Sequence, residues 1–539
     1  MLYMKINHLE KSYGGRTIFR VESLSLYNHE RIGVVGRNGQ GKSTLLSILA
    51  GTAKQDSGDV ERFGTIAYVP QLGGLDQDIR PDLHGKWRLA KQTEASGGEK
   101  TRRKIAQALT SDAHILIADE PTSHLDLNGI SQLEAELHAF KGAILLTSHD
   151  KDFLNKLCTT IWEIDEGKVT VYEGNYDAYL SQKQLEKDKG LKEYKEYVTE
   201  QNRLLEAAKK LKEKSDGIKK APSRMGNSEA RLHKRSSGVQ KAKLNRSAEA
   251  METRAQQLEK KEKPKETDPV VFNLADFPDM HSKRVVQFLE CTVNVGERTL
   301  IDKVTGEVER GSRLAITGGN GTGKTTLLKM IVDRSERLRV AQPAKIGFFS
   351  QHQENLDNQK TILVNVMEDS PYKETFVRNV LARLAFKRDD VFKNVSVLSG
   401  GERIRVSLAK VFLSDVNLLI LDEPTNYLDL DTKESLREIL LAYPGTILFV
   451  SHDRSFVSAL ATHHLSLEEE DPKVKVIEAT VGEAGITQIE EPDLLTIEMQ
   501  LTELLSRLSY TTNEEEKDQL DKQFKELIEK KKQLVRKAE

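Results

Sequence analysis

Two glycine-rich stretches carry the residue types that bind phosphate groups. They read GRNGQGKST at residues 36–44 and GGNGTGKTT at residues 318–326, and each lies between an apolar, strand-like run and a helical stretch. A loop in this position presents backbone N–H groups to phosphate oxygens, and the following helix adds positive partial charge at its N-terminus. We therefore predict two phosphate-binding loops, formed by Gly36, Asn38, Gly39, Gly41, Lys42, Ser43 and Thr44 and by Gly318, Asn320, Gly321, Gly323, Lys324, Thr325 and Thr326.

The end of each loop suits ATP carried with a magnesium ion. Lys42 and Lys324 stand where the lysine of such a loop reaches the β- and γ-phosphates. Ser43 and Thr325 follow directly, and their hydroxyl oxygens are suited to bind Mg²⁺. The sequence therefore predicts ATP and Mg²⁺ as cofactors of both loops.

An acidic pair ends an apolar strand in each half of the chain, in ILIADE and in LLILDE. Asp119 and Asp422 are suited to hold Mg²⁺ through its water shell. The next residues, Glu120 and Glu423, are placed to orient or deprotonate the water that attacks the γ-phosphate. Two phosphate loops, each followed by such a strand, favour ATP hydrolysis over a chance match of one motif.

Two further residue types recur at matching places. Gln71 and Gln351 each end an apolar strand, and we expect them to contact the metal or its water. His149 and His452 each lie between Ser and Asp at the end of a later strand, where we expect a contact to the γ-phosphate. A single histidine is more often a core residue, but its recurrence in both halves favours a catalytic role.

These motifs form an internal repeat that organises the chain. They occur in the same order in residues 1–180 and 284–485. Further matched pairs are IAYVPQ with IGFFSQ, ASGGEK with LSGGER, and LLTSHD with LFVSHD. Short apolar strands alternate with helical stretches, which is typical of a mainly parallel, helix-covered sheet. We therefore predict an α/β fold with two copies of one nucleotide-binding domain.

The segment 181–268 between the two repeats has a helical composition. It is rich in Lys, Glu, Gln, Leu and Ala, and its helix breakers cluster near the middle, in DGIKKAPSRMGNSEARLHKRSSG. Leu204, Leu205, Ala208 and Leu211 recur at helical spacing and give the first arm an apolar stripe. We expect two long antiparallel helices joined by a basic loop, and a disordered charged linker is the alternative.

The net charge of −2 hides an uneven distribution. The segment 181–268 contains 24 Lys and Arg against 15 Asp and Glu, so it carries +9 while the rest of the chain carries −11. A basic segment in an acidic chain points to a polyanionic partner such as RNA, and solvated charge without a partner is the alternative. The residues that we expect at the loop tip are Lys219, Lys220, Arg224, Met225, Arg231, Leu232, His233, Lys234 and Arg235.

Residues 490–539 form a separate element. Leucine and isoleucine recur at helical spacing, and the polar stretch TTNEEE interrupts them, which predicts a C-terminal extension folded as a second helical hairpin. Packing on the second domain and accessory binding are both open as its role.

The composition bounds the class of protein. At 539 residues the chain is too long for one core and suggests about three or four domains. Its two cysteines, Cys158 and Cys291, suggest neither a disulfide framework nor a thiolate metal site, so we expect a reducing cytoplasm. The N-terminus lacks an apolar signal-peptide core, and no apolar run approaches the roughly 20 residues that cross a bilayer. We expect no membrane-spanning role for the chain.

The SGGE stretches set the two repeats apart from other phosphate-loop enzymes. With them, Walker A, Q-loop, signature, Walker B, D-loop and H-loop motifs occur twice in order and resemble the ABC ATPase superfamily across most of the chain. In that superfamily two domains face head to tail, and the signature of one closes on ATP held by the other. The resemblance implies a monomer that pairs its own two domains. It adds to the ATP sites the signature residues Ser96, Gly97, Gly98, Glu99, Ser399, Gly400, Gly401 and Glu402.

The two repeats differ in two places. Tyr13 lies 23 residues before the first phosphate loop and resembles the aromatic residue that stacks on adenine in this superfamily, whereas Val295 stands at the aligned position of the second repeat. The interval from the Q-loop glutamine to the signature serine is 25 residues in the first repeat and 48 in the second. The shorter helical subdomain of the first repeat leaves little surface to dock a membrane domain.

Two fused ABC domains joined by a long charged hairpin resemble the ABC-F class of translation factors. The stretches YEGNYDAYL at 172–180 and PSRMGNSEARLHK at 222–234 are similar to that class. The linker and the short first subdomain are most similar to its antibiotic-resistance, ribosomal-protection branch, of the Vga, Vml, Lsa and Msr type. The resemblance implies a cytoplasmic factor that enters the E site of the bacterial 70S ribosome with ATP bound. Its tip would reach along 23S rRNA toward the peptidyl-transferase centre, act on the P-site tRNA and dislodge a drug.

Two other functions remain open from the sequence. A housekeeping ABC-F factor that tunes elongation would share the ATP sites and the linker. The ATPase subunit of an efflux transporter would need membrane subunits encoded elsewhere, and the short subdomain and basic hairpin weigh against it. DNA-repair ABC ATPases are less similar, because their zinc modules need cysteines that this chain lacks.

Overall fold

The computed structural model describes residues 1–71, 97–123, 125–217, 227–261, 263, 272, 277, 278, 280–296, 298–350, 355–386 and 388–477, without the side chains of 97, 98, 227–238, 298 and 388. Met1–Ile477 form one compact unit and Glu478–Glu539 a second. The predicted C-terminal extension, the interval between Gln71 and the first signature, and the tip-loop side chains therefore lie outside the described residues.

Domain 1, residues 1–180, is built on one mixed sheet. Its described strands run in the order β4-β1-β2-β9-β8-β3-β7-β6-β5, and β5, β6, β7, β3 and β8 are parallel neighbours. The strand bounds are β1 (Leu2–Tyr13), β2 (Arg16–Tyr27), β3 (Arg31–Val35), β4 (Ser57–Arg62), β5 (Ile66–Val69), β6 (Ile115–Asp119), β7 (Ala143–Thr147), β8 (Thr160–Asp165) and β9 (Lys168–Glu173). The predicted α/β class with a mainly parallel central sheet is confirmed.

Helices cover both faces of this parallel core, which explains why its strands are apolar throughout. In β7, Ala143 and Leu145 belong to one buried cluster, while Ile144 and Leu146 belong to the cluster on the opposite face. The helices that supply the covering side chains are α1 (Lys42–Ala50), α3 (Gly97–Thr110), α4 (Leu127–Ala139) and α5 (Lys151–Leu157).

Domain 2, residues 284–477, repeats this architecture. Its described strands form a sheet β14-β15-β16-β12-β17-β18 and a sheet β11-β10-β13, and a bridge between Thr305 and Lys473 connects them. The strands are β10 (Arg284–Val295), β11 (Arg298–Glu309), β12 (Arg313–Thr317), β13 (Leu338–Val340), β14 (Ile346–Phe349), β15 (Leu418–Asp422), β16 (Thr446–Val450), β17 (His463–Ser466) and β18 (Lys475–Val476). The helices are α8 (Lys324–Val332), α9 (Ile362–Met367), α10 (Glu374–Arg383), α11 (Gly400–Phe412), α12 (Leu430–Ala442) and α13 (Arg454–Leu460), with short 3-10 helices η2 (Arg388–Phe392) and η3 (Val395–Val397).

Strand order brings the sequence motifs together. In domain 1 the neighbouring parallel strands β6, β7 and β3 end respectively in the acidic pair, the His149 loop and the phosphate loop. In domain 2 the strands β15, β16 and β12 do the same. Because the carboxyl ends of parallel strands meet at one edge of a sheet, motifs more than a hundred residues apart converge there.

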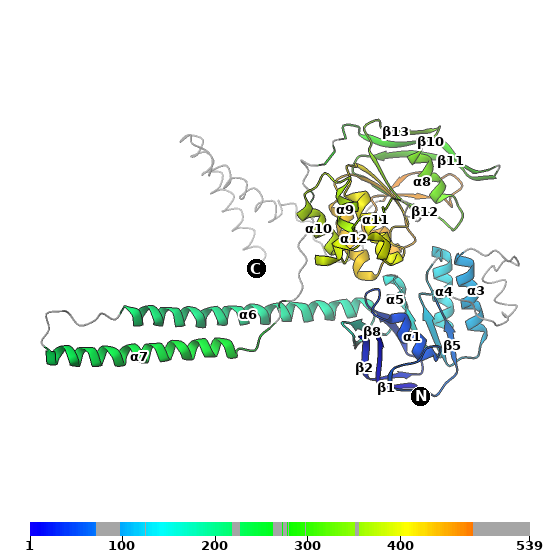
Figure 1. The fold of residues 1–539 in the computed structure, drawn as a ribbon. Helices are drawn as coiled ribbons and strands as arrows, with labels where there is room; N and C mark the ends of the chain where they lie inside the picture. Colours follow the sequence, from blue (N-terminus) through cyan, green and yellow to red (C-terminus); the bar gives the residue numbers. More distant parts are fainter. Residues whose placement is uncertain are drawn as a thin grey trace, which may run out of the picture. The chain divides into compact units, whose positions relative to one another are not determined.

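The segment between the domains forms two long helices that run side by side, α6 (Tyr176–Asp216) and α7 (Asn227–Gln257) (Figure 1). At 1.5 Å per residue, α6 is about 60 Å long. It begins at Tyr176, capped by the Asn175 side chain, and so starts five residues before the predicted boundary at Ser181. The predicted helical hairpin is confirmed, whereas its tip loop lies outside the described residues.

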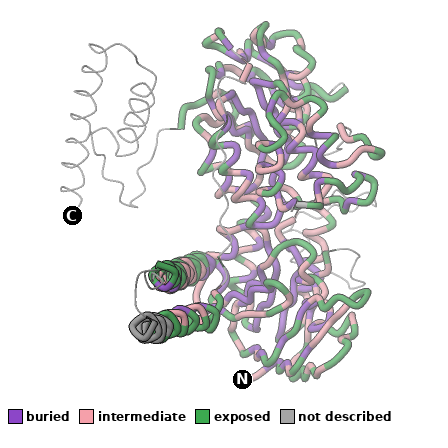
Figure 2. The backbone as a smooth tube through the Cα atoms, turned by 60° about the vertical axis from the view of Figure 1, so that its left-hand side comes forward, coloured by how far each residue is buried: buried purple, intermediate pink, exposed green. Residues whose placement is uncertain are grey.

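The arms pack along a seam with alternating spacing of three and four residues, as in a coiled coil. Its buried and half-buried residues are Tyr194, Tyr197, Gln201, Leu204, Ala208, Leu211 and Ser215 on α6 and Leu244, Ala248, Met251 and Ala255 on α7. Leu205 is 45% exposed, so its assignment to the apolar stripe was wrong. It lies about 100° around the helix from Leu204, which takes it off the seam. Figure 2 shows exposed residues covering the outer faces of both arms.

Candidate active site

Each phosphate loop has a position, at the N-cap of the following helix, that requires glycine. Gly41 is the N-cap of α1 with φ 91°, and a Cβ there would lie 2.4 Å from the Ile18 side chain. Gly323 is the N-cap of α8 with φ 97°. Because neither cap residue has a side chain, the first N–H groups of both helices stay open to an anion. The local geometry is therefore that of a phosphate cradle.

A lysine is held inside each cradle. Lys42 Nζ donates to the carbonyl oxygens of Gly36 at 2.6 Å and Arg37 at 3.2 Å. Lys324 Nζ donates to those of Gly318 at 2.9 Å and Gly319 at 2.8 Å. Burial lowers the pKa of both lysines. Phosphate oxygens would replace part of the lost hydration, so both lysines fit the predicted role.

Oxygen ligands for a hard cation converge beside the cradle. In domain 2 the Thr325 hydroxyl donates to Asp422 Oδ2 at 2.8 Å, so the two predicted metal ligands already lie in contact. In domain 1 Asp119 is buried and accepts from the Thr147 hydroxyl at 2.8 Å. No cluster of three or more His, Cys, Asp or Glu side chains suited to a metal occurs among the described residues. The hydroxyl and carboxylate oxygens of Thr325 and Asp422 are ligands that suit Mg²⁺, which keeps several waters and binds phosphate oxygens.

A buried glutamate faces a half-buried histidine at both sites. His149 Nε2 lies 3.2 Å from Glu120 Oε1, and His452 Nε2 lies 3.3 Å from Glu423 Oε1. Neither contact has hydrogen-bond geometry, and both Oε1 atoms lack a hydrogen-bond partner among the described residues. A buried oxygen without a partner suits a group that receives a water molecule.

Burial moves the pKa values of these pairs in opposite directions. It raises the pKa of Glu120 and that of Glu423 to about 7. It lowers the pKa of His452 to about 4 and that of His149 well below its usual value. The histidines are therefore neutral at physiological pH, and the glutamates titrate in the range where a general base is most effective.

Residues of one domain complete the phosphate loop of the other. In domain 1, Asn38 N donates to Asp429 Oδ2 at 2.9 Å, and Asn38 Nδ2 donates to the Tyr427 carbonyl at 3.1 Å. Arg37 pairs with Asp431 at 3.1 Å. On the other side, Asn320 N lies 3.5 Å from Asp126 Oδ2. The D-loops therefore cross between the domains, as head-to-tail pairing requires.

The signature of domain 2 stands at the N-terminus of α11. Ser399 caps this helix in a reciprocal capping box with Glu402. A Cβ on Gly401 would lie 3.6 Å from the Tyr427 carbonyl, which itself accepts from Asn38 of domain 1. The signature of domain 2 is therefore adjacent to the phosphate loop of domain 1. We call this composite arrangement site 1 and its counterpart, with the phosphate loop of domain 2, site 2.

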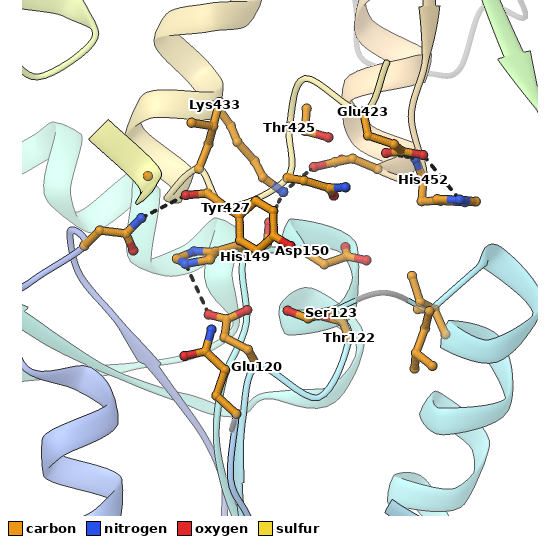
Figure 3. A pocket seen from close by; sticks show the side chains of 18 of the residues that line it. Glu120, Thr122, Ser123, His149, Asp150, Glu423, Thr425, Tyr427, Lys433 and His452 are labelled. Carbon is orange, nitrogen blue, oxygen red and sulfur yellow. Dashed lines mark hydrogen bonds and ion pairs between the residues drawn. The ribbon is translucent and has the colours of Figure 1, made fainter. Parts of the chain in front are cut away.

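One cavity of about 950 Å³ joins both sites (Figure 3). The predicted residues that line it are Tyr13, Asn38, Gly39, Gly41, Lys42, Ser43, Thr44, Gln71, Glu120, His149, Asn320, Gly321, Gly323, Lys324, Thr325, Thr326, Ser399, Gly401, Asp422, Glu423 and His452. The predicted residues that do not line it are Gly36, Glu99, Asp119, Gly318, Gly400 and Glu402, while Gly97 and Gly98 are described only as the start of α3. Ser96 and Gln351 lie outside the described residues.

The two adenine regions differ as expected from the sequence. Tyr13 lines the cavity, as does Ile18, and the tyrosine residue is 55% exposed. In site 2 the matching apolar wall is Leu300, whereas Val295 is exposed and does not line the cavity. An aromatic platform is thus available in site 1, and an aliphatic wall replaces it in site 2.

Sequence analysis missed the residues that act across the domain interface. Arg37, Asp126, Asp429, Asp431 and Lys433 were not among the predicted site residues. Asp126, Asp429 and Asp431 contact the phosphate loop of the other domain, and Lys433 contacts its H-loop. Arg37 belongs to a phosphate loop itself and pairs with Asp431 across the interface. Arg37 and Lys433 are positions at which the two repeats differ. Gly319 of the second repeat matches Arg37, and Ile130 of the first repeat matches Lys433. Comparing the repeats for such differences would have found them.

Comparison with known proteins agrees with this geometry. A family model described as ABC transporter matches residues 19–92 and 301–426, and an extension model with the same description matches 162–232. Erythromycin resistance ATP-binding protein MsrA of Staphylococcus epidermidis is 32% identical over 84% of this chain and 95% of its own length. Ribosome protection protein VmlR of Bacillus subtilis is 30% identical over 96% of both chains. The chain belongs to the ABC-F family.

Other relatives extend the ABC-F comparison. Energy-dependent translational throttle protein EttA of Mycobacterium tuberculosis is 30% identical over 86% of this chain and 91% of its own. The crystal structure of archaeal ribosome recycling factor aABCE1 with stalk protein aP1 shares the fold, with a TM-score of 0.59, 18% identity and coverage of 87% and 89%. None of the helices in the described part of the chain is long and apolar enough to span a membrane.

This ABC-F protein is an ATP hydrolase, and its side chains divide the work. Lys42 and the open N-terminus of α1 are placed to hold the phosphates, and the N-terminus of α11 lies against them from the other domain. Glu120, when ionised, is placed to accept the proton of an attacking water, and the neutral His149 lies beside it. A bound Mg²⁺ would neutralise charge on the phosphates. Lys324, Glu423 and His452 have the matching positions in site 2 and suit the same roles.

Proposed function

We propose that this ABC-F ATPase protects bacterial 70S ribosomes from antibiotics. With ATP and Mg²⁺ bound in both sites, the monomer closes, enters the E site in the cytoplasm and directs its hairpin tip toward the peptidyl-transferase centre. The tip residues, between Lys219 and Arg235, then act on 23S rRNA and the P-site tRNA and displace the drug. Hydrolysis opens the two domains and releases the protein.

The observation that carries this proposal is the way the hairpin is rooted. Tyr176 and Tyr179 at the start of α6 lie in a buried cluster of domain 1 that also contains Leu430 of domain 2. The Tyr179 hydroxyl donates to Glu163 at 2.7 Å, and Lys183 pairs with the same carboxylate at 2.7 Å. A helix anchored where the ATP-binding domains meet is placed to follow their closure.

Charge on the described part of the hairpin supports an RNA partner. Exposed cations lie on both arms near the end of the hairpin away from domain 1, at Lys209, Lys210, Lys214, Lys243 and Arg246. Phosphate contacts by such residues give affinity that depends little on base sequence and falls with salt. Similarity to the ribosome protection protein VmlR and to the erythromycin resistance protein MsrA supports ribosome protection over other ABC-F functions.

Ribosome binding is tested with the double variant Glu120→Gln, Glu423→Gln. This variant keeps the phosphate cradles but lacks both general bases, so we expect it to pellet with 70S particles in ATP. The matched control, Lys42→Ala with Lys324→Ala, should stay in the supernatant because it loses its phosphate contacts. If the Gln variant also stays in the supernatant with ATP bound, ribosome binding is refuted and membrane partners become the next candidates.

A housekeeping role in elongation is the second candidate, favoured by the similarity to EttA. Deleting the tip, Met225 to Arg235, separates the two. We expect the deletion to abolish resistance to macrolide, lincosamide, streptogramin A or pleuromutilin drugs while ATPase activity persists. Unchanged resistance would remove the tip from the mechanism, and no resistance from the full chain would favour the housekeeping role.

A further inference from the structure

Lys433 is a half-buried cation that joins the two domains between sites 1 and 2. It lies on α12 of domain 2, and its side chain is 13% exposed. Its Nζ donates to the carbonyl oxygen of His149 in domain 1 at 2.7 Å and to Asp453 Oδ2 in domain 2 at 2.8 Å. Figure 3 shows Lys433 reaching down from domain 2 toward His149. One side chain therefore connects the H-loops of both sites.

The contact of Lys433 with the His149 carbonyl has no counterpart from domain 1 to the H-loop of domain 2 among the described residues. The residue that matches Lys433 in domain 1 is Ile130 on α4, which is buried and has no group that could donate to the His452 carbonyl. Other contacts across the interface do have counterparts: Lys151 pairs with Glu434, and Arg454 donates to Ser131 and the Leu127 carbonyl. The lysine is thus an asymmetric addition to a nearly symmetric interface.

The charges around Lys433 show why it matters when the domains are closed. Asp150 and Asp453 both cap the helices after their H-loops, accepting from Phe153 and Phe456 at 3.0 Å. Burial raises the pKa of Asp150, whereas the pKa of Asp453 is lowered, by its contacts with Lys433 among others, against the effect of burial. The ammonium group therefore offsets the negative charge that closure brings together.

We propose that Lys433 is a positioning residue through which domain 2 holds the H-loop of site 1 in its working geometry. His149 Nε2 lies 3.2 Å from Glu120, and its backbone is fixed from the opposite domain by the lysine. Closure therefore completes site 1 in a way that it does not complete site 2. Because catalytic geometry tolerates shifts of less than about 1 Å, releasing the His149 carbonyl slows the chemical step at site 1.

The test measures each site separately in single-turnover hydrolysis of pre-bound ATP. The Glu423→Gln background reports site 1, and the Glu120→Gln background reports site 2. We expect Lys433→Met to slow hydrolysis at site 1 at least tenfold, with less than a threefold change in the ATP concentration that half-saturates binding. Site 2 should change less than threefold. Lys433→Arg, which keeps a cationic donor, should recover most of the site 1 rate.

Two controls separate positioning from loss of the interface. Arg437→Met changes a cation one turn further along α12, where the partner is Glu434 on the same helix, and should leave both rates within threefold. A melting curve of the nucleotide-free chain checks that Lys433→Met is folded. An equal fall at both sites, or an unchanged site 1 rate, would overturn the proposal. The assay needs no ribosome, so its result is independent of the proposed function.

Discussion

Each catalytic glutamate is held in a conformation that an ordinary residue avoids. Glu120 and Glu423 have positive φ values of 52° and 50°, in the left-handed region that costs an L-residue about 1 kcal/mol or more. Their pKa values of about 7 lie above that of His452, the reverse of the usual order. Between these values both partners are neutral, and above pH 7 only the glutamate is charged. The pair is therefore a poised base beside a neutral imidazole rather than an ion pair.

We predict that Glu120→Gln stabilises the nucleotide-free chain at pH 8. In the folded chain the pKa of the Glu120 carboxyl is about 7, above its ordinary value of 4.5, so the folded state binds this proton more tightly than the unfolded state. The stability from the neutral acid is present below pH 4.5 and is lost as pH rises to about 7. Glutamine does not ionise, so the variant avoids this loss. The loss lowers the free energy of unfolding by up to about 3 kcal/mol at pH 8 and by little at pH 4.5. Urea unfolding at both pH values measures it.

The control for this prediction is Glu61→Gln on the exposed strand β4, which should change stability equally little at both pH values. An equal gain from Glu120→Gln at both pH values would show that the gain has nothing to do with titration. Destabilisation at pH 8 would show that the carboxylate makes contacts that glutamine cannot replace.

Residues fixed by local sequence were predictable, and residues fixed by domain pairing were not. Lys42, Glu120 and His149 follow from motifs in which strand, loop and helix are contiguous, and the repeat doubled that signal. Lys433 lies within a stretch of ordinary helical sequence, and its importance depends on which surface of domain 1 it meets. Leu205 was misplaced for a related reason, because the phase of a seam is set by the partner arm.

The hairpin is an element with one covered face. Beyond the start of α6 its described arms pack against each other, and the small seam residues Ala208 and Ala248 allow close approach of the helices. Ion pairs between Lys212 and Glu252 at 2.6 Å and between Lys241 and Asp216 at 3.2 Å flank the seam, but such exposed pairs contribute little. Its cohesion therefore depends on the few buried side chains.

We predict that Ala208→Glu separates the arms without affecting the ATPase. A carboxylate forced into the fully buried Ala208 position costs about 2 kcal/mol or more, and the helices avoid this cost by moving apart. Amide hydrogen exchange in the outer half of both arms should accelerate at least tenfold, while ATP turnover stays within twofold. Leu205→Glu, on the exposed face of the same helix, should leave exchange unchanged. Slow exchange in Ala208→Glu would show that the seam is not what holds the arms.

At the scale of the whole molecule, the two composite sites are built from the same parts but held together differently. Site 1 has the Arg37–Asp431 pair, and the matching positions of site 2 hold Gly319 and Asn128. Lys433 strengthens the same side of the interface. Duplication has thus left two equivalent sets of catalytic residues with unequal support for closure.

We predict that Arg37→Gly weakens ATP-dependent closure modestly. The Arg37 and Asp431 side chains are 46% and 66% exposed, so their pair contributes at most about 1 kcal/mol. The ATP concentration that half-saturates closure should rise no more than about fivefold, and 0.5 M salt should remove the difference. Energy transfer between labels in the two domains measures closure in the Glu120→Gln, Glu423→Gln background. The control Arg20→Gly removes an exposed ion pair within domain 1 and should have no effect on closure. A rise much larger than fivefold for Arg37→Gly would mean that Arg37 also contacts nucleotide.

Helix α6 runs without interruption from the body of domain 1 into the hairpin, so a small rotation at its base would become a large displacement at its far end. The hydrogen bond from Tyr179 to Glu163 attaches the base of the helix to domain 1, and most of the 41-residue helix extends beyond this attachment. For an arm about 60 Å long, a rotation of about 5° at the base sweeps the far end through about 5 Å. A rotation of that size would therefore displace the far end of the helix by about the length of a side chain.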